Sequence, residues 1–140
     1  MPEKTYQGPS LPKIGHGGEC WVYRYSPNLV LKVYRSKFHR DRAHARQKKA
    51  YLKDFAPPTQ GKLRYGKSWG YLSSRAELYD IKQSMRLKDM LFLEKKMKAI
   101  GLSPNDVCEV NAGYYKGRLV VIDFGDISTV YCEDVGIIDD

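Results

Sequence analysis

The chain has 140 residues, a length that fits one domain and allows a buried core. Hydrophobic residues make up 42% of it and charged residues 29%, which is typical of a soluble globular protein. No apolar run approaches the roughly 18 residues that cross a bilayer, and residues 1–10 lack the apolar stretch of a secretion signal. We therefore expect a cytoplasmic protein that has no contact with a membrane.

The formal net charge is +8, and the basic residues are unevenly distributed. Within residues 35–53 the only acidic residue is Asp41, and the basic residues there are Arg35, Lys37, Arg40, Arg42, Arg46, Lys48, Lys49 and Lys53. We call these residues the basic stripe. They are consistent either with a solvated helix face or with a surface that binds an acidic partner. No nucleic-acid-binding motif accompanies them.

The three cysteines, Cys20, Cys108 and Cys132, are far apart in the sequence. Their number is odd, and none has the spacing of a metal-binding motif, so neither a disulfide framework nor a zinc site is predicted. We expect three free thiols in a reducing compartment.

The first third of the chain predicts a glycine-rich turn and a hairpin. After an irregular lead-in over residues 1–12, glycines are concentrated in residues 14–18. Two apolar stretches follow, at 20–25 and 29–34, and both are predicted strands. Ser26-Pro27-Asn28 between them is a typical turn sequence, so the strands are expected to form a hairpin.

A helix and a second pair of strands are predicted next. Residues 38–55 contain no glycine or proline, which predicts a helix that stops before Pro57-Pro58. Two more strands are expected on either side of Gly66, at 62–65 and 69–73.

The remaining elements are a helical region and a hairpin. The helical region is expected to begin near Arg75 and is best marked over 85–100, where apolar residues recur at helical spacing and Gly101 follows. Strands around Tyr114-Tyr115 and over 118–122 are expected to pair. This order of elements indicates an α+β fold and not a regular βαβ alternation.

Three features suggest a site for phosphates. Gly15, Gly17 and Gly18 can bring backbone N–H groups close to an anion, although a turn without any ligand fits equally well. Lys32 lies in the middle of an apolar strand, on the face of Val30 and Tyr34. Such a lysine needs either an anion nearby or a path to solvent.

The third feature lies in the last third of the chain. Asp106 and Asn111 form a D-x-x-x-x-N pattern, and Asp123 follows a predicted buried strand. Asp123 and Asn111 offer the oxygen ligands that suit Mg²⁺, and Asp106 is placed to accept the proton of an attacking hydroxyl. Taken singly, Asp106 as a loop cap and Asp123 as the start of a turn are the better interpretations.

Together these elements resemble the signature motifs of protein kinases in order and approximate spacing, over residues 13–126. Gly15, Gly17 and Val22 match the glycine-loop pattern, with Cys20 in place of its third glycine. Asp123-Phe124-Gly125 matches the D-F-G motif.

The resemblance implies roles for these residues. Lys32 would contact the phosphates of ATP, with Asp106 as the catalytic base and Asn111 and Asp123 as ligands of Mg²⁺. Residues 69–73 would form the hinge that contacts adenine.

The resemblance also implies a single minimal kinase-like domain over 1–140. Residues 1–74 would form a small antiparallel N-lobe sheet with one helix and the hinge, and residues 75–140 a reduced helical C-lobe. Apolar surface left by the missing C-lobe helices would be covered by a partner or by a second copy of the chain. The small size is similar to that of kinase-like proteins from phages or mobile elements, which would place the protein in a host cytoplasm.

The sequence departs from the kinase pattern at two further places. The first helix has no glutamate to orient Lys32, and either Gln47 or Lys48 stands at that position, which leaves Asp123 or nothing to hold the lysine. Pro104-Asn105 replaces the His-Arg pair that precedes the catalytic aspartate in kinases.

Two functions follow from this resemblance. The first is an ATP- and Mg²⁺-dependent serine/threonine protein kinase that acts on a protein substrate or on itself. The second is a nucleotide-binding pseudokinase that inhibits or regulates a macromolecular partner. A small-molecule kinase fits less well, because such enzymes carry a larger helical lobe.

Overall fold

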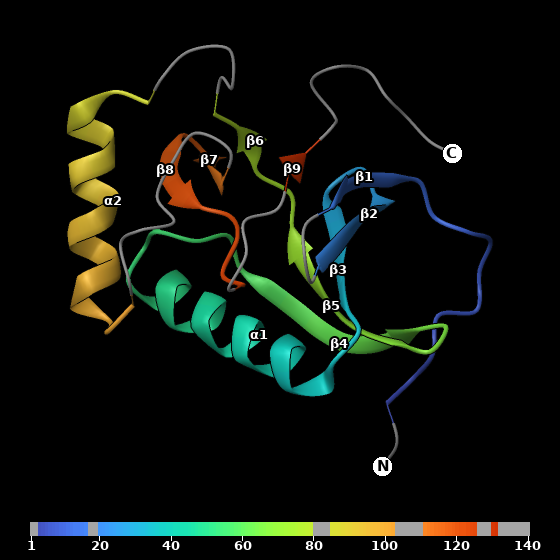
Figure 1. The fold of residues 1–140 in the computed structure, drawn as a ribbon. Helices are drawn as coiled ribbons and strands as arrows, with labels where there is room; N and C mark the ends of the chain where they lie inside the picture. Colours follow the sequence, from blue (N-terminus) through green and yellow to red (C-terminus); the bar gives the residue numbers. More distant parts are fainter. Residues whose placement is uncertain (1–2, 17–19, 80–84, 103–110, 126–129, 132–140) are drawn as a thin grey trace.

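The computed structural model describes residues 3–16, 20–79, 85–102, 111–125 and 130–131. Over these residues the chain forms two antiparallel sheets and two helices (Figure 1). The α+β class expected from the sequence is confirmed. In the part of the chain that is described, no helix has the length and apolar character needed to cross a membrane.

The larger sheet has six strands in the order β4-β5-β3-β2-β1-β9. The strands are β1 (Lys13–His16), β2 (Cys20–Ser26), β3 (Leu29–Tyr34), β4 (Thr59–Tyr65), β5 (Ser68–Ser74) and β9 (Val130–Tyr131). The predicted β2–β3 and β4–β5 hairpins are both present. The lead-in is not wholly irregular, because Thr5 forms a parallel bridge to Arg64 of β4.

Helix α1 (Lys37–Leu52) packs on the β3, β4 and β5 part of this sheet (Figure 1). Ser36 caps its start by accepting a hydrogen bond from the His39 backbone N–H at 3.3 Å. The side of α1 that faces the sheet is unusually polar, since Arg40, His44 and Gln47 are buried there. This helix therefore lacks a clear apolar stripe, and it contributes polar groups to the interior.

The smaller sheet has three strands, β6 (Glu77–Leu78), β7 (Ala112–Tyr115) and β8 (Arg118–Val121), in that order. Helix α2 (Leu87–Ala99) packs against β8, and Gly101 follows it with a φ of 79°. The expectation of helix from Arg75 onward was wrong for 77–78. These residues pair with β7, where Gly113 permits the contact because a Cβ there would lie 2.3 Å from the Glu77 carbonyl oxygen.

The two sheets are joined through buried side chains and backbone hydrogen bonds. One core cluster links α1, α2 and the smaller sheet, and it includes Phe55, Leu93, Met97 and Val121. The Val121 N–H donates to the Phe55 carbonyl at 2.8 Å. This contact fixes the segment that follows β8 against the end of α1.

Candidate functional site

Lys32 lies on β3, between β2 and β5, and only 3% of its surface is exposed. Its Nζ donates to Gln47 Oε1 at 3.0 Å and to the carbonyl oxygen of Ile122. The interpretation of Lys32 as an edge-strand lysine that reaches solvent is therefore wrong. The predicted strand alternation is correct, since Val30 and Tyr34 share one buried cluster while the other face of β3 packs in a second cluster. Both faces are covered, so the ammonium is held inside the protein.

Gln47 of α1 is the central residue of this buried network. Its Oε1 accepts from Lys32 and, at 2.8 Å, from the Tyr71 hydroxyl. Its Nε2 donates to the Pro57 carbonyl at 3.0 Å and to Ser73 Oγ at 2.7 Å. The amide is used both as acceptor and as donor, a combination that a carboxylate does not provide.

The sequence left open which residue replaces the helical glutamate of kinases. The structure places Gln47 against Lys32, whereas Lys48 is exposed on the outside of α1. The two acceptors of Lys32 that are described, the Gln47 amide and the Ile122 carbonyl, are both uncharged.

Two features of its surroundings shift the pKa of Lys32 in opposite directions. Burial lowers the pKa of Lys32, and the nearby carboxylate of Asp123 offsets part of that effect, so that the pKa is lowered overall. Burial also raises the pKa of Tyr71 well above its ordinary value, which keeps its hydroxyl protonated as a donor to Gln47. The Tyr71 ring centroid lies 5.8 Å from Nζ and adds a favourable contact with the cation.

Asp123 and Asn111 are brought together by the segment after β8. The Ile122 N–H donates to the Asn111 carbonyl at 2.9 Å, which places Asn111 beside the residue that precedes Asp123. Both side chains are buried. Asp123 Oδ1 also accepts from the Gly125 N–H at 3.0 Å, so the carboxylate does begin a turn, as one interpretation of the sequence held.

Helix α1 holds the Asp123-Phe124-Gly125 segment directly. Arg46 donates to the Phe124 carbonyl at 3.3 Å, one residue before the Gln47 that holds Lys32. The Phe124 ring is buried 6.4 Å from the Phe55 ring. No local sequence pattern predicts this hydrogen bond of Arg46, because the two residues are 78 positions apart in the chain.

A small pocket lies next to Lys32. Val30, Lys32 and Ile122 line it together with residues 73–76. Most of the range expected to form a hinge, 69–73, lies inside β5, between β4 and β3. Trp69 instead stacks against the Arg64 guanidinium, 3.9 Å from its ring centroid.

The predicted glycine loop is only partly described. Gly15 is buried in β1 and pairs with Val22 of β2, and the Val22 side chain is fully buried in the same cluster as Val30. Gly17 and Gly18 lie outside the described residues, as does Asp106. Cys20, at the position of the third glycine, is a buried free thiol, as expected.

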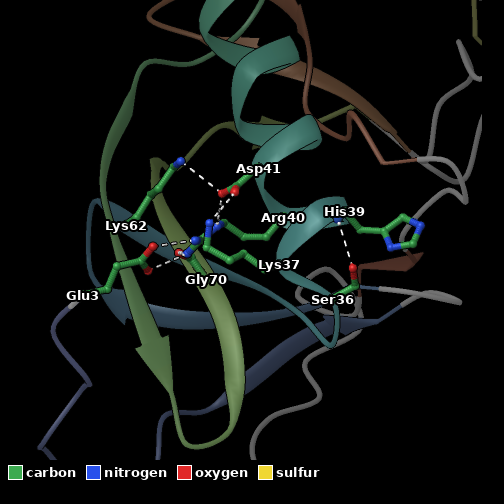
Figure 2. Close-up of polar contacts among 8 residues, drawn as sticks. All are labelled: Glu3, Ser36, Lys37, His39, Arg40, Asp41, Lys62 and Gly70. Atoms are coloured by element: carbon green, nitrogen blue, oxygen red, sulfur yellow. Dashed lines mark hydrogen bonds and ion pairs between the residues drawn. The ribbon is translucent and has the colours of Figure 1, made fainter. Parts of the chain in front are cut away.

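The basic stripe is not one continuous surface. Arg40 is completely buried, and its guanidinium binds Glu3 at 2.6 and 2.8 Å, Asp41 at 2.7 Å and the Gly70 carbonyl at 2.8 Å (Figure 2). Asp41 also pairs with Lys37 at 3.1 Å and with Lys62 at 3.0 Å. These residues fasten the first residues of the chain, α1 and β4 together.

What remains of the stripe for an outside partner is smaller than expected. Arg46 is used on Phe124, and the Arg42 guanidinium lies 4.9 Å from the Phe38 ring centroid. Lys48, Lys49 and Lys53 are the exposed lysines at the end of α1.

Comparisons with known proteins do not assign the chain to a family. No family model matches its sequence, and no curated protein matches it.

Asp123 and Asn111 can supply only some of the ligands that a magnesium ion needs. Within the described ranges, no group of three or more His, Cys, Asp and Glu side chains is placed to hold a metal. Mg²⁺, however, is usually held by one or two protein carboxylates together with phosphates and water. Asp123 with the amide oxygen of Asn111 suits that kind of site.

Proposed function

We propose that the chain binds ATP together with Mg²⁺ beside Lys32 and transfers a phosphoryl group to a hydroxyl of a protein or of the chain itself. The observation that most supports this is the state of Lys32. A fully buried cation whose described hydrogen-bond acceptors are both neutral favours an anionic ligand.

Each candidate residue identified from the sequence has a role in this proposal. Lys32 holds the phosphates, Asn111 and Asp123 hold the metal, and Asp106 orients or deprotonates the attacking hydroxyl. Bound Mg²⁺ would neutralise charge on the phosphates. Gly15, Gly17, Gly18 and Val22 would contribute to nucleotide binding.

The adenine base and the two lobes also have places in this proposal. The pocket bounded by Val30, Ile122 and residues 73–76 takes the adenine. The larger sheet with α1 acts as a kinase-like N-lobe, and the smaller sheet with α2 acts as a reduced C-lobe.

Phosphoryl transfer is tested by incubating the chain with radiolabelled ATP and Mg²⁺, alone and with a cell extract. We expect label on the chain or on an extract protein, and loss of label in Asp106→Ala and in Asp123→Ala. Asp54→Asn is the matched control, because this aspartate is exposed, pairs with an exposed Arg118 among the described residues, and has a positive φ that asparagine tolerates. Equal labelling in all variants would contradict the proposal.

Nucleotide binding is tested separately by thermal unfolding with and without Mg²⁺-ATP. A ligand that binds only the folded state raises the unfolding temperature, by an amount that grows with the logarithm of its concentration relative to Kd. We expect an upward shift in the wild type and none in Lys32→Ala. The absence of any shift in the wild type would remove the ATP site altogether.

A second function is favoured by Gln47. In its place a kinase has a carboxylate that pairs with the lysine, and here a neutral amide with four hydrogen bonds stands there. Nucleotide-dependent stabilisation without phosphoryl transfer would indicate a pseudokinase that regulates a partner.

A further inference from the structure

Helix α2 buries one side and leaves large apolar side chains on the other. Leu93 and Met97 lie in the core, whereas Leu87, Leu91 and Phe92 are 64%, 53% and 44% exposed. Figure 1 shows α2 at the edge of the molecule, with its far side turned away from the other drawn elements. Three exposed apolar residues within six positions are more than chance scatter on a small surface.

The exposed charges on the same helix are all positive. Lys88, Lys95 and Lys98 are exposed among the apolar residues, and none of them forms an ion pair with another residue of the described ranges. The two acids of α2 are only partly exposed, and one of them, Asp89, accepts a hydrogen bond from the Tyr79 hydroxyl at 2.9 Å. We define the outer face of α2 by its six residues, which are Leu87, Lys88, Leu91, Phe92, Lys95 and Lys98.

The start of α2 adds to this positive character. Arg86 occupies the N-cap position and makes no side-chain capping hydrogen bond. The unpaired N–H groups of a helix N-terminus carry partial positive charge, which favours a nearby anion. A carboxylate placed there by another molecule would meet Arg86, Lys88 and these N–H groups together.

We propose that the outer face of α2 binds an acidic amphipathic helix of another protein. Its apolar residues would pack on Leu87 and Leu91, which are one helical turn apart, and its carboxylates would face the three lysines. The site is separate from the nucleotide pocket, since no residue of α2 lines that pocket.

Other occupants fit this face less well. A second copy of the chain would set lysines against lysines. A helix that inserts into a membrane surface separates its apolar and basic residues onto different faces, whereas here lysines and leucines share one face. Nucleic acid offers phosphates to the lysines but no apolar surface for the leucines.

The test uses two synthetic helical peptides as probes, labelled for fluorescence anisotropy. Both carry leucines at every third or fourth position. One has glutamates beside them, and the other has lysines in place of the glutamates. The intact chain should bind the acidic peptide at least about tenfold more tightly than the basic one, and added salt should weaken that binding.

Variants of the chain locate the binding surface. Reversing Lys88, Lys95 and Lys98 to glutamate should lower the affinity at least about tenfold, as should Leu91→Ser. Reversing Lys48, Lys49 and Lys53 to glutamate is the matched control, with the same change of charge on α1, and should alter the affinity much less. Circular dichroism establishes that each variant is folded.

Three results would overturn the proposal. The first is equal binding, or no binding, of the two peptides. The second is binding to phosphatidylserine-containing vesicles or to an oligonucleotide that exceeds binding to the acidic peptide. The third is a concentration-dependent dimer that Leu91→Ser abolishes. Asp123→Ala should leave peptide binding unchanged, so failure of the nucleotide site and failure of this surface can be distinguished.

Discussion

At the scale of single residues, the interior of this protein is organised by one amide. Gln47 connects β3, β5 and the segment before β4 through four hydrogen bonds, and it accepts one of them from Lys32, the one lysine buried among the described residues. Buried groups that lose a partner cost more free energy than the same bonds contribute when made. The stability of the chain should therefore be sensitive to chemical changes at this position that preserve its size.

Replacement of Gln47 by leucine, which has similar volume, should lower the free energy of unfolding by about 3 kcal/mol or more. It leaves the Lys32 ammonium, the Tyr71 hydroxyl and the Pro57 carbonyl with fewer partners. Gln47→Glu keeps an acceptor for Lys32 but loses the donor to Pro57, so its effect should be intermediate. Urea denaturation measures both variants. The exposed neighbour provides the control, because Lys48→Leu should change the free energy of unfolding by no more than about 0.5 kcal/mol.

Nucleotide binding should depend on pH through Lys32. Burial lowers the pKa of Lys32 in the free protein. A bound phosphate favours the charged form of the lysine. Above the lowered pKa, nucleotide binding should therefore be coupled to the uptake of a proton. The affinity for Mg²⁺-ATP should therefore fall with rising pH before the ordinary lysine pKa of about 10.4 is reached. Isothermal titration calorimetry across this range measures the effect. In Lys32→Arg the charge persists at every pH tested, and any remaining binding should lose this dependence.

At the scale of elements, the ends of the strands and helices are determined by local chemistry. Ser36 starts α1, and Gly101 follows α2 in the left-handed region of backbone space. Gly101 was recognised in the sequence as the end of the second helix, whereas Ser36 was not singled out and the first helix was expected to begin near residue 38. The helices and hairpins were still predicted within a few residues. The strand at Glu77-Leu78 was not predicted, because its conformation depends on pairing with β7, far along the chain.

Gly101→Ala should lower the free energy of unfolding by about 1 kcal/mol, because alanine is strained at a φ of 79°. No atom lies within 4 Å of the position where its Cβ would be, so the cost is one of backbone conformation and not of a clash. Gly61→Ala is the matched control. It has the same open space without a positive φ, and should be neutral. Thermal or urea denaturation compares the two, and equal losses would contradict this explanation.

Local sequence patterns likewise predict some features of the candidate site and not others. The burial of Lys32, Asn111 and Asp123 follows from their positions in or beside apolar strands, and motif spacing placed them together. The hydrogen bonds of Gln47 and Arg46 depend on how α1 docks on the sheet, which no local pattern encodes.

At the scale of the whole molecule, an ionic cluster around the buried Arg40 holds the N-terminal segment to α1 and β4. Arg40 binds Glu3 and Asp41 (Figure 2). Its hydrogen bonds lower the pKa of Glu3. Against the opposing effect of burial, Lys62, Arg40 and Lys37 together lower the pKa of Asp41. A carboxyl whose pKa is lower in the folded state stabilises that state above its ordinary pKa. This contribution is lost as pH falls toward the lowered value.

The protein should accordingly lose stability as pH falls below about 4, where carboxylates of unfolded chains take up protons. In a Glu3→Gln, Asp41→Asn double variant, stability at neutral pH should be lower and its further decline in acid should be smaller. Glu77→Gln with Asp54→Asn removes one glutamate and one aspartate that are exposed, and should leave the acid profile close to that of the wild type. Urea titrations over a pH series measure both pairs.

The same N-terminal segment has a second consequence, which concerns contacts between molecules. β4 is the last strand at one edge of the larger sheet, and Lys4 and Tyr6 occupy part of its open side through backbone hydrogen bonds of 2.8 Å to Arg64. Uncovered strand edges are templates for pairing with other chains and for aggregation. A chain shortened to begin at Gly8 should expose this edge, and sheet-to-sheet association between copies should then limit its solubility before unfolding does.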